Sequence, residues 1–200
     1  MKKDFFAQKA NSYEDDKNRV SNVQNIANTI KKELSFNKSM DIMDFGSGTG
    51  LLLEKIAPLV NKITAIDMSK SMNKKLNEKK DILDCELEIL EIDLSTNRLN
   101  QKFDCIISSM TLHHIKDIKS LLKDFYTYLN TNASIAIADL DIEDGSFHIE
   151  DTGVFHFGFN REELENLVKE IGFKNVKIQD ASIAYKPYGE YPVFLLTACK

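Results

Sequence analysis

The segment that most constrains the fold is residues 41–53, which read DIMDFGSGTGLLL. A short apolar run that carries the acid Asp44 is followed by glycines at positions 46, 48 and 50, and then by leucines that continue at helical spacing. This order predicts a β-strand, a tight glycine turn and a helix N-terminus. Glycine is needed where the backbone takes a positive φ angle or where a ligand contacts bare backbone. A glycine turn at the carboxyl end of a strand is where open α/β sheets bind nucleotide-like ligands.

The spacing of the glycines distinguishes two classes of ligand. The dinucleotide fingerprint is G-x-G-x-x-G, and its third glycine would fall at Leu51 here. Instead the glycines alternate, and Asp44 stands two residues before the first of them. A carboxylate there suits a ligand with ammonium and sulfonium groups better than a pyrophosphate. The phrase acid-x-G-x-G-x-G resembles the first motif of the class I S-adenosylmethionine-dependent methyltransferases.

The composition limits the class of protein. A chain of 200 residues, 42% hydrophobic and 28% charged, suits one domain with a full core. The net charge of −5 makes a nucleic-acid partner an unfavoured expectation. No run approaches a membrane span, and the N-terminus lacks the apolar core of a signal peptide. The three cysteines fit neither a disulfide framework nor a zinc spacing, so we expect a cytoplasmic protein.

Two further acids follow expected strands. Residues 62–66, KITAI, predict a second strand that ends at Asp67. Its two carboxylate oxygens can accept both ribose hydroxyls of a nucleoside; the alternative for this residue is a helix cap. Asp93 follows a third strand around Leu87 and Ile89, and on its own it would be an ordinary loop residue. In the resembled family an acid here accepts a hydrogen bond from the adenine amino group, and the next residue, Leu94, donates its backbone N–H to the ring.

The resemblance therefore implies a site for S-adenosylmethionine, with S-adenosylhomocysteine as the product. The implied site combines the glycine turn with residues at the ends of several strands. Its members are Asp44, Gly46, Ser47, Gly48, Thr49, Gly50, Asp67, Met68, Asp93, Leu94 and Ser109.

The histidines and the remaining acids are candidates for acid–base chemistry. Residues 103–109, FDCIISS, predict a central buried strand, and the Leu-His-His that follows is similar to a phrase of small-molecule and ubiquinone-type methyltransferases. Adjacent residues on a helix point about 100° apart, so we expect no metal site at the histidine pair. A general base is needed only if the acceptor is protonated near neutral pH. The candidates, none of them assigned by spacing, are His114, His148, His156, Asp139 and Asp141.

The rest of the chain predicts the architecture. The pattern predicts, in order, a helix at 118–129, a fifth strand at 134–138, an irregular loop at 143–159 and a helix from 160 to 171. Two strands follow, at 175–185 and 191–199, and the short link between them implies an antiparallel pair. We expect an α/β, Rossmann-like three-layer sandwich, with a seven-stranded mixed sheet, helices on both faces and the last strand antiparallel between its neighbours.

We expect a single domain over 1–200, with a helical cap at 1–36 and the core at 37–200. Apolar residues at helical spacing from Asp16 onward predict the helix of the cap. By resemblance, Tyr13 or Arg19 of the cap would lie near the methionine end of the cofactor. The expected function is methyl transfer to a small-molecule acceptor. A non-catalytic cofactor-binding or regulatory protein is the alternative; a nicotinamide-dependent dehydrogenase is disfavoured by Asp44 and Leu51. The acceptor, the methylated element (N, O, S or C) and the oligomeric state are not predicted.

Overall fold

Seven strands form one mixed sheet in the computed structural model, which describes residues 4–200. The strand order is β3-β2-β1-β4-β5-β7-β6. The pairs among β1 to β5 are parallel, and β7 runs antiparallel to both β5 and β6. The predicted sheet, with its last strand antiparallel between two neighbours, is therefore confirmed. The strands are β1 Asp41–Phe45, β2 Lys62–Ile66, β3 Glu86–Leu90, β4 Phe103–Ser109, β5 Leu129–Leu140, β6 Lys174–Lys186 and β7 Gly189–Cys199.

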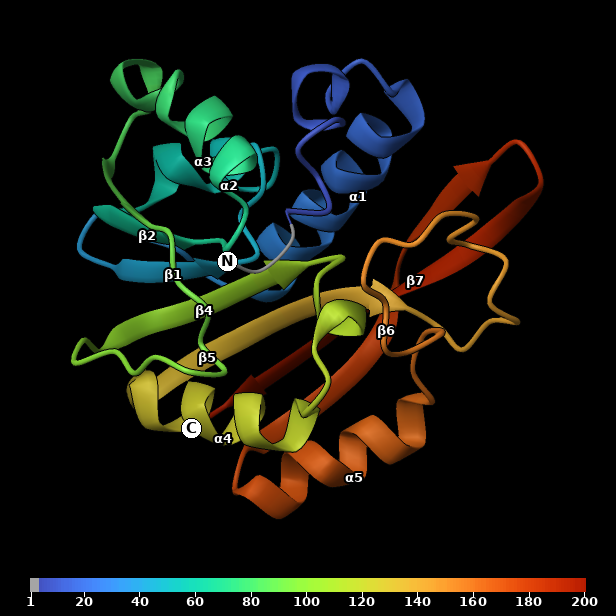
Figure 1. The fold of residues 1–200 in the computed structure, drawn as a ribbon. Helices are drawn as coiled ribbons and strands as arrows, with labels where there is room; N and C mark the ends of the chain where they lie inside the picture. Colours follow the sequence, from blue (N-terminus) through green and yellow to red (C-terminus); the bar gives the residue numbers. More distant parts are fainter. Residues whose placement is uncertain (1–3) are drawn as a thin grey trace.

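Helices cover both faces of the sheet, so the three-layer prediction is also confirmed. Figure 1 shows α1, α2 and α3 on one side of the sheet and α4 and α5 on the other. The α-helices are α1 Lys17–Glu33, α2 Leu53–Ile56, α3 Lys70–Asn77, α4 Ile118–Tyr128 and α5 Arg161–Ile171. Short 3₁₀ turns are η1 Ala10–Ser12, η2 Ala57–Leu59, η3 Lys80–Ile82 and η4 Leu112–His114. Within the described residues, no helix is both long and apolar enough to cross a membrane.

The two cores follow from strand geometry. Successive side chains of a strand point to opposite faces, so Ile42 of β1 packs in the core beneath α1 and α2, whereas Met43 packs in the core against α4 and α5. The side chains of the neighbouring strand β4 alternate in the same way: Ile107 packs in the core beneath α1 and α2, and Ile106 packs in the core against α4 and α5. Because both faces are covered, the exposed ends of the parallel strands are where a ligand can approach the sheet.

Side-chain caps set the ends of the helices. Asp16, Ser69, Asp117 and Asn160 each accept hydrogen bonds from backbone N–H groups in the first turns of α1, α3, α4 and α5. Such caps are worth about 1 kcal/mol each. Gly172 ends α5 in the left-handed conformation, with φ +117°. These local signals explain why the helix starts at Asp16 and Asn160 could be predicted.

Several boundaries differ from the prediction by one or two residues, and the start of β5 differs most. The strand β5 begins at Leu129, directly after α4, rather than at residue 134. Residues 130–132, Asn-Thr-Asn, are exposed, and Asn132 has a positive φ of 63°. Polar residues at an irregular strand start carry no alternating apolar pattern, and this start was therefore missed. The link between β3 and β4, described in full, contains no helix.

Candidate functional site

A cavity of about 170 Å³ lies at the carboxyl ends of β1 and β4. It combines the glycine turn with the N-terminal segment and with the loop that follows β5. Its lining includes Asp44, Gly46, Ser47, Gly48, Thr49, Ser109, Phe6, Tyr13, Arg19, His113, His114, Phe147 and His148. The structure thus brings the glycine turn together with residues that are far away in the sequence.

The three glycines of the turn differ in what they require. Gly46, Gly48 and Gly50 all have positive φ angles, which side chains rarely tolerate. A Cβ atom at Gly46 would fall 2.2 Å from the side chain of Thr111, so this glycine also permits close packing. A Cβ atom at Gly48 would meet nothing within 4 Å. The backbone of Gly48 therefore lies bare beside open space, as expected where a ligand contacts the main chain.

Asp44 is a buried acid without a full set of partners. Its side chain is 1% exposed, and its Oδ2 atom has no hydrogen-bond partner. Burial, and secondarily the nearby Asp67, raises the pKa of the Asp44 carboxyl to about 8. The group is thus mostly protonated at neutral pH, and a cationic ligand beside it would favour its ionised form.

Asp67 connects the end of β2 to the glycine turn. Its Oδ2 atom accepts a hydrogen bond from the Gly48 N–H at 2.9 Å, and its Oδ1 atom accepts one from the Ser69 N–H at 2.8 Å. Burial raises the pKa of Asp67, although these two hydrogen bonds oppose the shift. The N-cap of α3 is Ser69, which accepts from the Met72 N–H, so Asp67 is not the cap residue itself.

Unpartnered polar atoms are concentrated at this cavity. Eight buried side-chain oxygen or nitrogen atoms lack a hydrogen-bond partner in the part of the chain that the structure describes. Six of these eight belong to residues that line the cavity: Asn22, Asp44, Ser47, Thr49, Ser109 and His148. Because a buried polar group without a partner costs about 1–3 kcal/mol, the cavity is suited to a polar ligand that satisfies these groups.

Five of the predicted cofactor residues do not belong to the lining of the cavity. Asp67 and Met68 follow β2, while Asp93 and Leu94 follow β3. The Oδ1 atom of Asp93 accepts a hydrogen bond from the Ser95 N–H at 2.8 Å. Gly50, also outside the lining, packs against Leu76 of α3. The predicted set therefore divides into a group around the cavity and a group at the ends of β2 and β3.

A buried hydrogen bond joins His113 to Asp139. The histidine lies in η4 after β4, and the aspartate lies near the end of β5; their Nδ1 and Oδ1 atoms are 2.7 Å apart. Burial on its own would raise the pKa of the Asp139 carboxyl. The nearby His113 and hydrogen bonds from His113 and Leu140 outweigh this effect, so the pKa is lowered overall. Asp139 has 0% exposure and does not line the cavity, so direct contact with an acceptor is blocked.

Of the other acid–base candidates, His114 and His148 line the cavity. Burial, followed by the nearby His113, lowers the pKa of His114 to about 4 and that of His148 to about 3. Both imidazoles are therefore neutral at physiological pH. His156 is turned elsewhere, and its Nε2 donates to the Ile115 carbonyl at 2.9 Å. Both oxygens of Asp141 accept hydrogen bonds from Arg161 at 2.6 Å.

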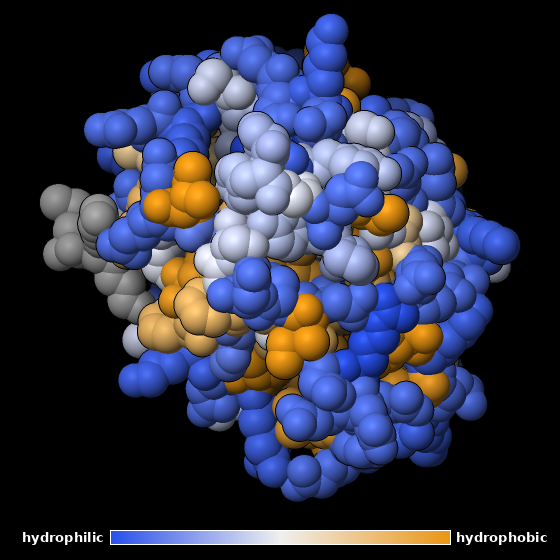
Figure 2. Space-filling view, turned by 90° about the vertical axis from the view of Figure 1, so that its right-hand side faces the viewer, coloured by the Kyte–Doolittle hydropathy of each residue, from blue (hydrophilic) through white to orange (hydrophobic). Residues whose placement is uncertain are grey.

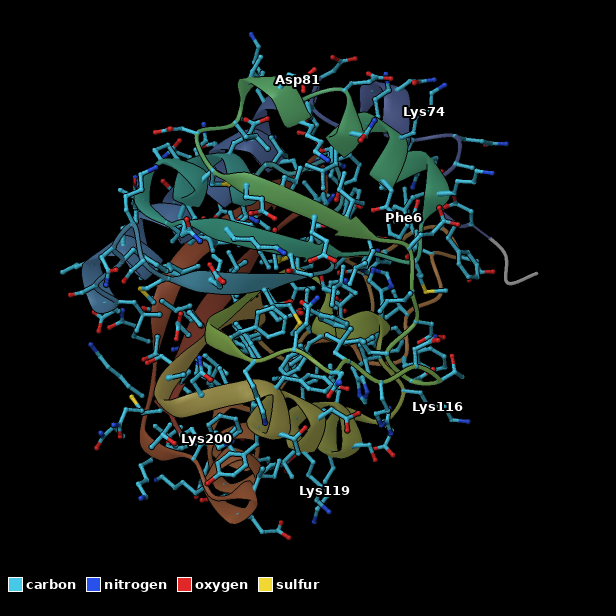
Figure 3. The ribbon with its side chains drawn as sticks, turned by 90° about the vertical axis from the view of Figure 1, so that its left-hand side faces the viewer. Phe6, Lys74, Asp81, Lys116, Lys119 and Lys200 are labelled. Carbon is cyan, nitrogen blue, oxygen red and sulfur yellow. The ribbon has the colours of Figure 1, made fainter. Side chains whose placement is uncertain are left out.

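The N-terminal segment closes one side of the site. Asp4 accepts hydrogen bonds from the hydroxyls of Ser69 and Ser71, at 2.9 and 2.8 Å, at the start of α3. The ring of Phe6 packs edge-on against His114, with centroids 5.6 Å apart. Figure 3 shows Phe6 at the end of the sheet toward which the strand arrows point. An ion pair of 2.7 Å between Lys9 and Glu150 ties this segment to the loop after β5.

The loop after β5 presents apolar side chains to the surface. Ile142, Ile149, Phe155 and Phe157 are each more than half exposed. Figure 2 shows separate apolar side chains among hydrophilic ones on the side of the molecule that carries this loop. The sequence expectation of an irregular segment is met, because residues 143–159 contain no helix and, apart from an isolated bridge at Phe159, no strand.

Comparison with known proteins gives one family. A family model described as a methyltransferase domain matches residues 19–178. An uncharacterized methyltransferase of Schizosaccharomyces pombe is 31% identical over 171 residues, which cover 77% of this chain and 58% of that protein. A malonyl-[acyl-carrier protein] O-methyltransferase of Bacillus anthracis is 30% identical over 111 residues, which cover 52% of this chain and 39% of that protein. The chain spans about half the length of the curated relatives it matches.

A solved structure shares the fold. Haemonchus contortus phosphoethanolamine N-methyltransferase 2, in complex with S-adenosyl-L-methionine, is similar with a TM-score of 0.70. The similarity covers 88% of this chain and 52% of that one, at 16% sequence identity. At this identity the match concerns the architecture described above.

Proposed function

The chain belongs to the methyltransferase family whose model spans residues 19–178, and on that premise we propose that it transfers a methyl group from S-adenosylmethionine to a small-molecule acceptor. The observation that carries the proposal is that the cavity combines Asp44 with the bare backbone of Gly48. Asp44 offers an unpartnered buried oxygen to a cation, and Gly48 leaves room for a ligand against the main chain. The cofactor has both an ammonium group and a sulfonium group.

The described residues suggest how the cofactor would be held. The methionine end would lie in the cavity, where Asp44 would accept from its ammonium group and Ser47, Thr49 and Ser109 offer further polar atoms. The cavity is smaller than the roughly 300–1,000 Å³ of pockets that enclose a whole drug-sized ligand. The nucleoside would therefore extend outside it, along the ends of β2 and β3.

Asp67 and Asp93 are placed to receive the nucleoside. Each oxygen of Asp67 accepts one backbone hydrogen bond and keeps a further lone pair for a ribose hydroxyl. Asp93 and Leu94 stand at the next strand end, where the family places the adenine ring. We propose these roles because β2 and β3 are neighbouring parallel strands that end at the same edge of the sheet.

The protein's part in the reaction would be placement and exclusion of water. S-adenosylmethionine supplies an activated methyl group, and the chain holds the two reactants in line. Such alignment contributes roughly 7–11 kcal/mol to catalysis. The N-terminal segment and the loop after β5 would enclose the reacting groups, since Phe6 and Phe147 form apolar walls of the cavity. His114 and His148 line the cavity, but with pKa values lowered to about 4 and about 3 they are weak bases, so an acceptor that ionises would lose its proton to solvent.

Calorimetric titration with S-adenosylhomocysteine tests cofactor binding. Wild-type protein should bind it, Asp44→Asn should bind it more weakly, and Asp81→Asn should be unaffected because Asp81 is exposed in η3, away from the site. A search for methyl transfer to a set of small metabolites then tests turnover. Binding of NAD instead would replace the proposal with a dehydrogenase. Cofactor binding with no turnover on any acceptor would favour a regulatory protein.

A further inference from the structure

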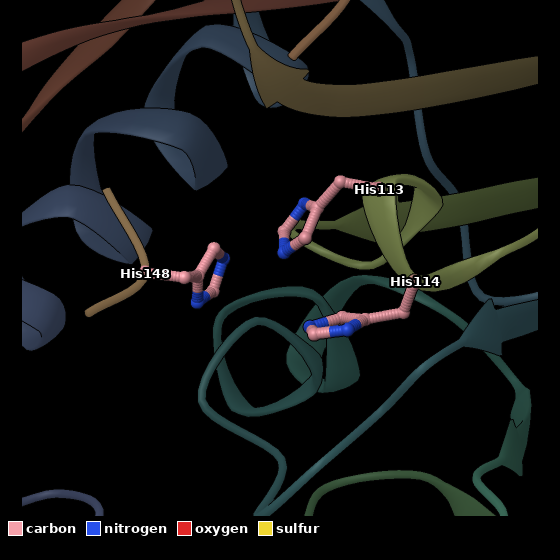
Figure 4. A group of neighbouring side chains, drawn as sticks. All are labelled: His113, His114 and His148. Atoms are coloured by element: carbon pink, nitrogen blue, oxygen red, sulfur yellow. The ribbon is translucent and has the colours of Figure 1, made fainter. Parts of the chain in front are cut away.

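Three of the four histidines in the chain form one cluster at the cavity. His113 and His114 come from η4, and His148 comes from the loop after β5. One ring nitrogen from each lies within 4.8 Å of those of the other two. The rings of the adjacent pair are 4.3 Å apart between centroids, and that of His148 is 5.0 Å from His113. Figure 4 shows the three rings turned toward a shared point.

The hydrogen bonds of the cluster leave the same nitrogen free on each ring. Asp139 accepts from Nδ1 of His113 at 2.7 Å, and the Gly153 carbonyl accepts from Nδ1 of His114 at 3.4 Å. Nδ1 of His148 is paired with the Thr152 hydroxyl at 3.1 Å. With Nδ1 engaged in each ring, Nε2 is the nitrogen left to bind a ligand. For His148 the Nε2 atom is buried and has no partner.

This pattern is the one that metal-ligating histidines show. Such a histidine almost always uses its second ring nitrogen to donate to a carboxylate, a backbone carbonyl or water, which fixes the ring and its tautomer. Asp139 and the Gly153 carbonyl supply these outer contacts here. Without a bound group, the buried Nε2 atom of His148 is left without a hydrogen-bond partner beside the other two rings.

We propose that His113, His114 and His148 bind one divalent transition-metal ion of the zinc class through their Nε2 atoms. Three imidazoles suit zinc, cobalt or nickel, whereas magnesium and calcium prefer oxygen ligands. Zinc–nitrogen bonds of about 2.0–2.1 Å place tetrahedral nitrogens about 3.3 Å apart. The cluster must therefore contract, and His148 can move because it lies on a loop while Asp139 holds His113.

The proposal departs from the expectation that neighbouring histidines do not share an ion. That expectation considered only the directions in which adjacent residues leave a helix, whereas the side chains of His113 and His114 both reach the cavity and their ring centroids lie 4.3 Å apart. The third ligand, His148, lies on a loop 34 residues after His114, so the sequence contains no short metal-binding motif that would indicate it.

Three histidines leave a fourth position open, as in catalytic zinc sites. This role rests on the proposed function, whereas binding of the ion does not. The open position faces the cavity shared with the glycine turn, so it suits an acceptor whose hydroxyl or thiol can be ligated. That group would lose its proton to solvent. Its oxygen or sulfur would then bond to the methyl carbon as the sulfonium S–C bond breaks and the sulfur of the cofactor keeps that electron pair.

Cobalt(II) is the probe for the site. Chelator-treated wild-type protein titrated with CoCl₂ should develop visible d–d absorption that saturates at one equivalent and disappears when ZnCl₂ is added. His148→Ala should lose affinity by more than the roughly 10- to 100-fold typical of an outer-contact change. His156→Ala is the matched control, since His156 lies on the same loop but bonds to the Ile115 carbonyl. It should retain the one-equivalent absorption.

Thermal unfolding separates loss of a ligand from loss of the fold. ZnCl₂ should raise the Tm of wild-type and His156→Ala protein but not that of His148→Ala, and all three should unfold cooperatively without zinc. Equal cobalt affinity in wild type and His148→Ala, or no visible band in wild type, would overturn the metal site. Titration with S-adenosylhomocysteine is read separately: a protein that binds cobalt but no cofactor would refute the proposed function and leave the metal site standing.

Discussion

Cofactor binding should be coupled to the loss of a proton from Asp44. The pKa of this buried carboxyl is raised to about 8, so at pH 7 roughly nine in ten folded molecules carry the proton. An ammonium group bound at its unpartnered Oδ2 would favour the carboxylate. Binding of S-adenosylhomocysteine at pH 7 should therefore release about 0.9 proton from this site.

The affinity should follow the ionised fraction of Asp44. That fraction is about one half at pH 8 and about one hundredth at pH 6, so the affinity should fall roughly 50-fold over this interval. Keeping the carboxyl ionised at pH 7 costs about 1.4 kcal/mol of binding free energy. Asp44→Asn should remove both the proton release and this pH dependence.

The unliganded protein should show the opposite trend in stability. The folded pKa is raised above the unfolded value of 3.8, so the stabilisation from protonated Asp44 is complete below that value and is lost as pH rises through about 8. Between pH 3.8 and about pH 8, the Asp44 carboxyl lowers the free energy of unfolding by about 1.4 kcal/mol for each unit of rising pH. Asn at position 44 should remove this contribution.

Calorimetry in buffers of different ionisation enthalpy measures the proton release directly. The apparent binding enthalpy at pH 7 should differ between phosphate and Tris in proportion to the released proton, and Asp44→Asn should show no such difference. A wild-type enthalpy that is the same in both buffers, together with a flat affinity from pH 6 to 8, would refute the placement of the ammonium group beside Asp44.

Other substitutions separate binding from folding. Asp67→Ala should weaken S-adenosylhomocysteine binding about a hundredfold, given charged hydrogen bonds of roughly 1.5–3 kcal/mol each. It should also lower the Tm, because the N–H groups of Gly48 and Ser69 lose their acceptor. Calorimetric titration measures the first effect and thermal unfolding the second, and absence of either would contradict this role of Asp67. Gly46→Ala should lower the Tm more than Gly48→Ala, since its Cβ atom would fall 2.2 Å from a side chain, whereas Gly48→Ala should mainly weaken cofactor binding; the reverse order would contradict the assignment. Hydrogen exchange in residues 4–13 and 143–159 should slow together when cofactor and acceptor bind, because an ion pair joins the two segments; unchanged exchange in both would exclude a shared lid.

The parts of the fold that could be predicted are those with local signals. The glycine turn, the helix start at Asp16 and the helix end at Gly172 each depend on residues a few positions apart. The shared edge at which Asp44, Asp67 and Asp93 lie could be predicted because parallel strands end at the same edge of the sheet. The N-terminal boundary of β5 lacked such a signal, since its first residues are polar and exposed.

The histidine cluster could not be predicted for a different reason. His113 and Asp139 are brought together by the pairing of β4 with β5, and His148 returns on an irregular loop. Alternation and helical periodicity say nothing about where such a loop passes. Candidate bases could therefore be named from the sequence, while the contacts that distinguish Asp139 from Asp141 required the structure.

The placement of β7 between β5 and β6 sets an order for folding. During synthesis β5 emerges before β6 and β7. The edge of β5 that β7 later occupies therefore stays unpaired until the β6–β7 hairpin docks. An unpaired strand edge is a template for association with other chains. We expect slow, concentration-sensitive refolding, with β5 amides on that edge gaining protection in pulse-labelled hydrogen exchange no earlier than those of β7.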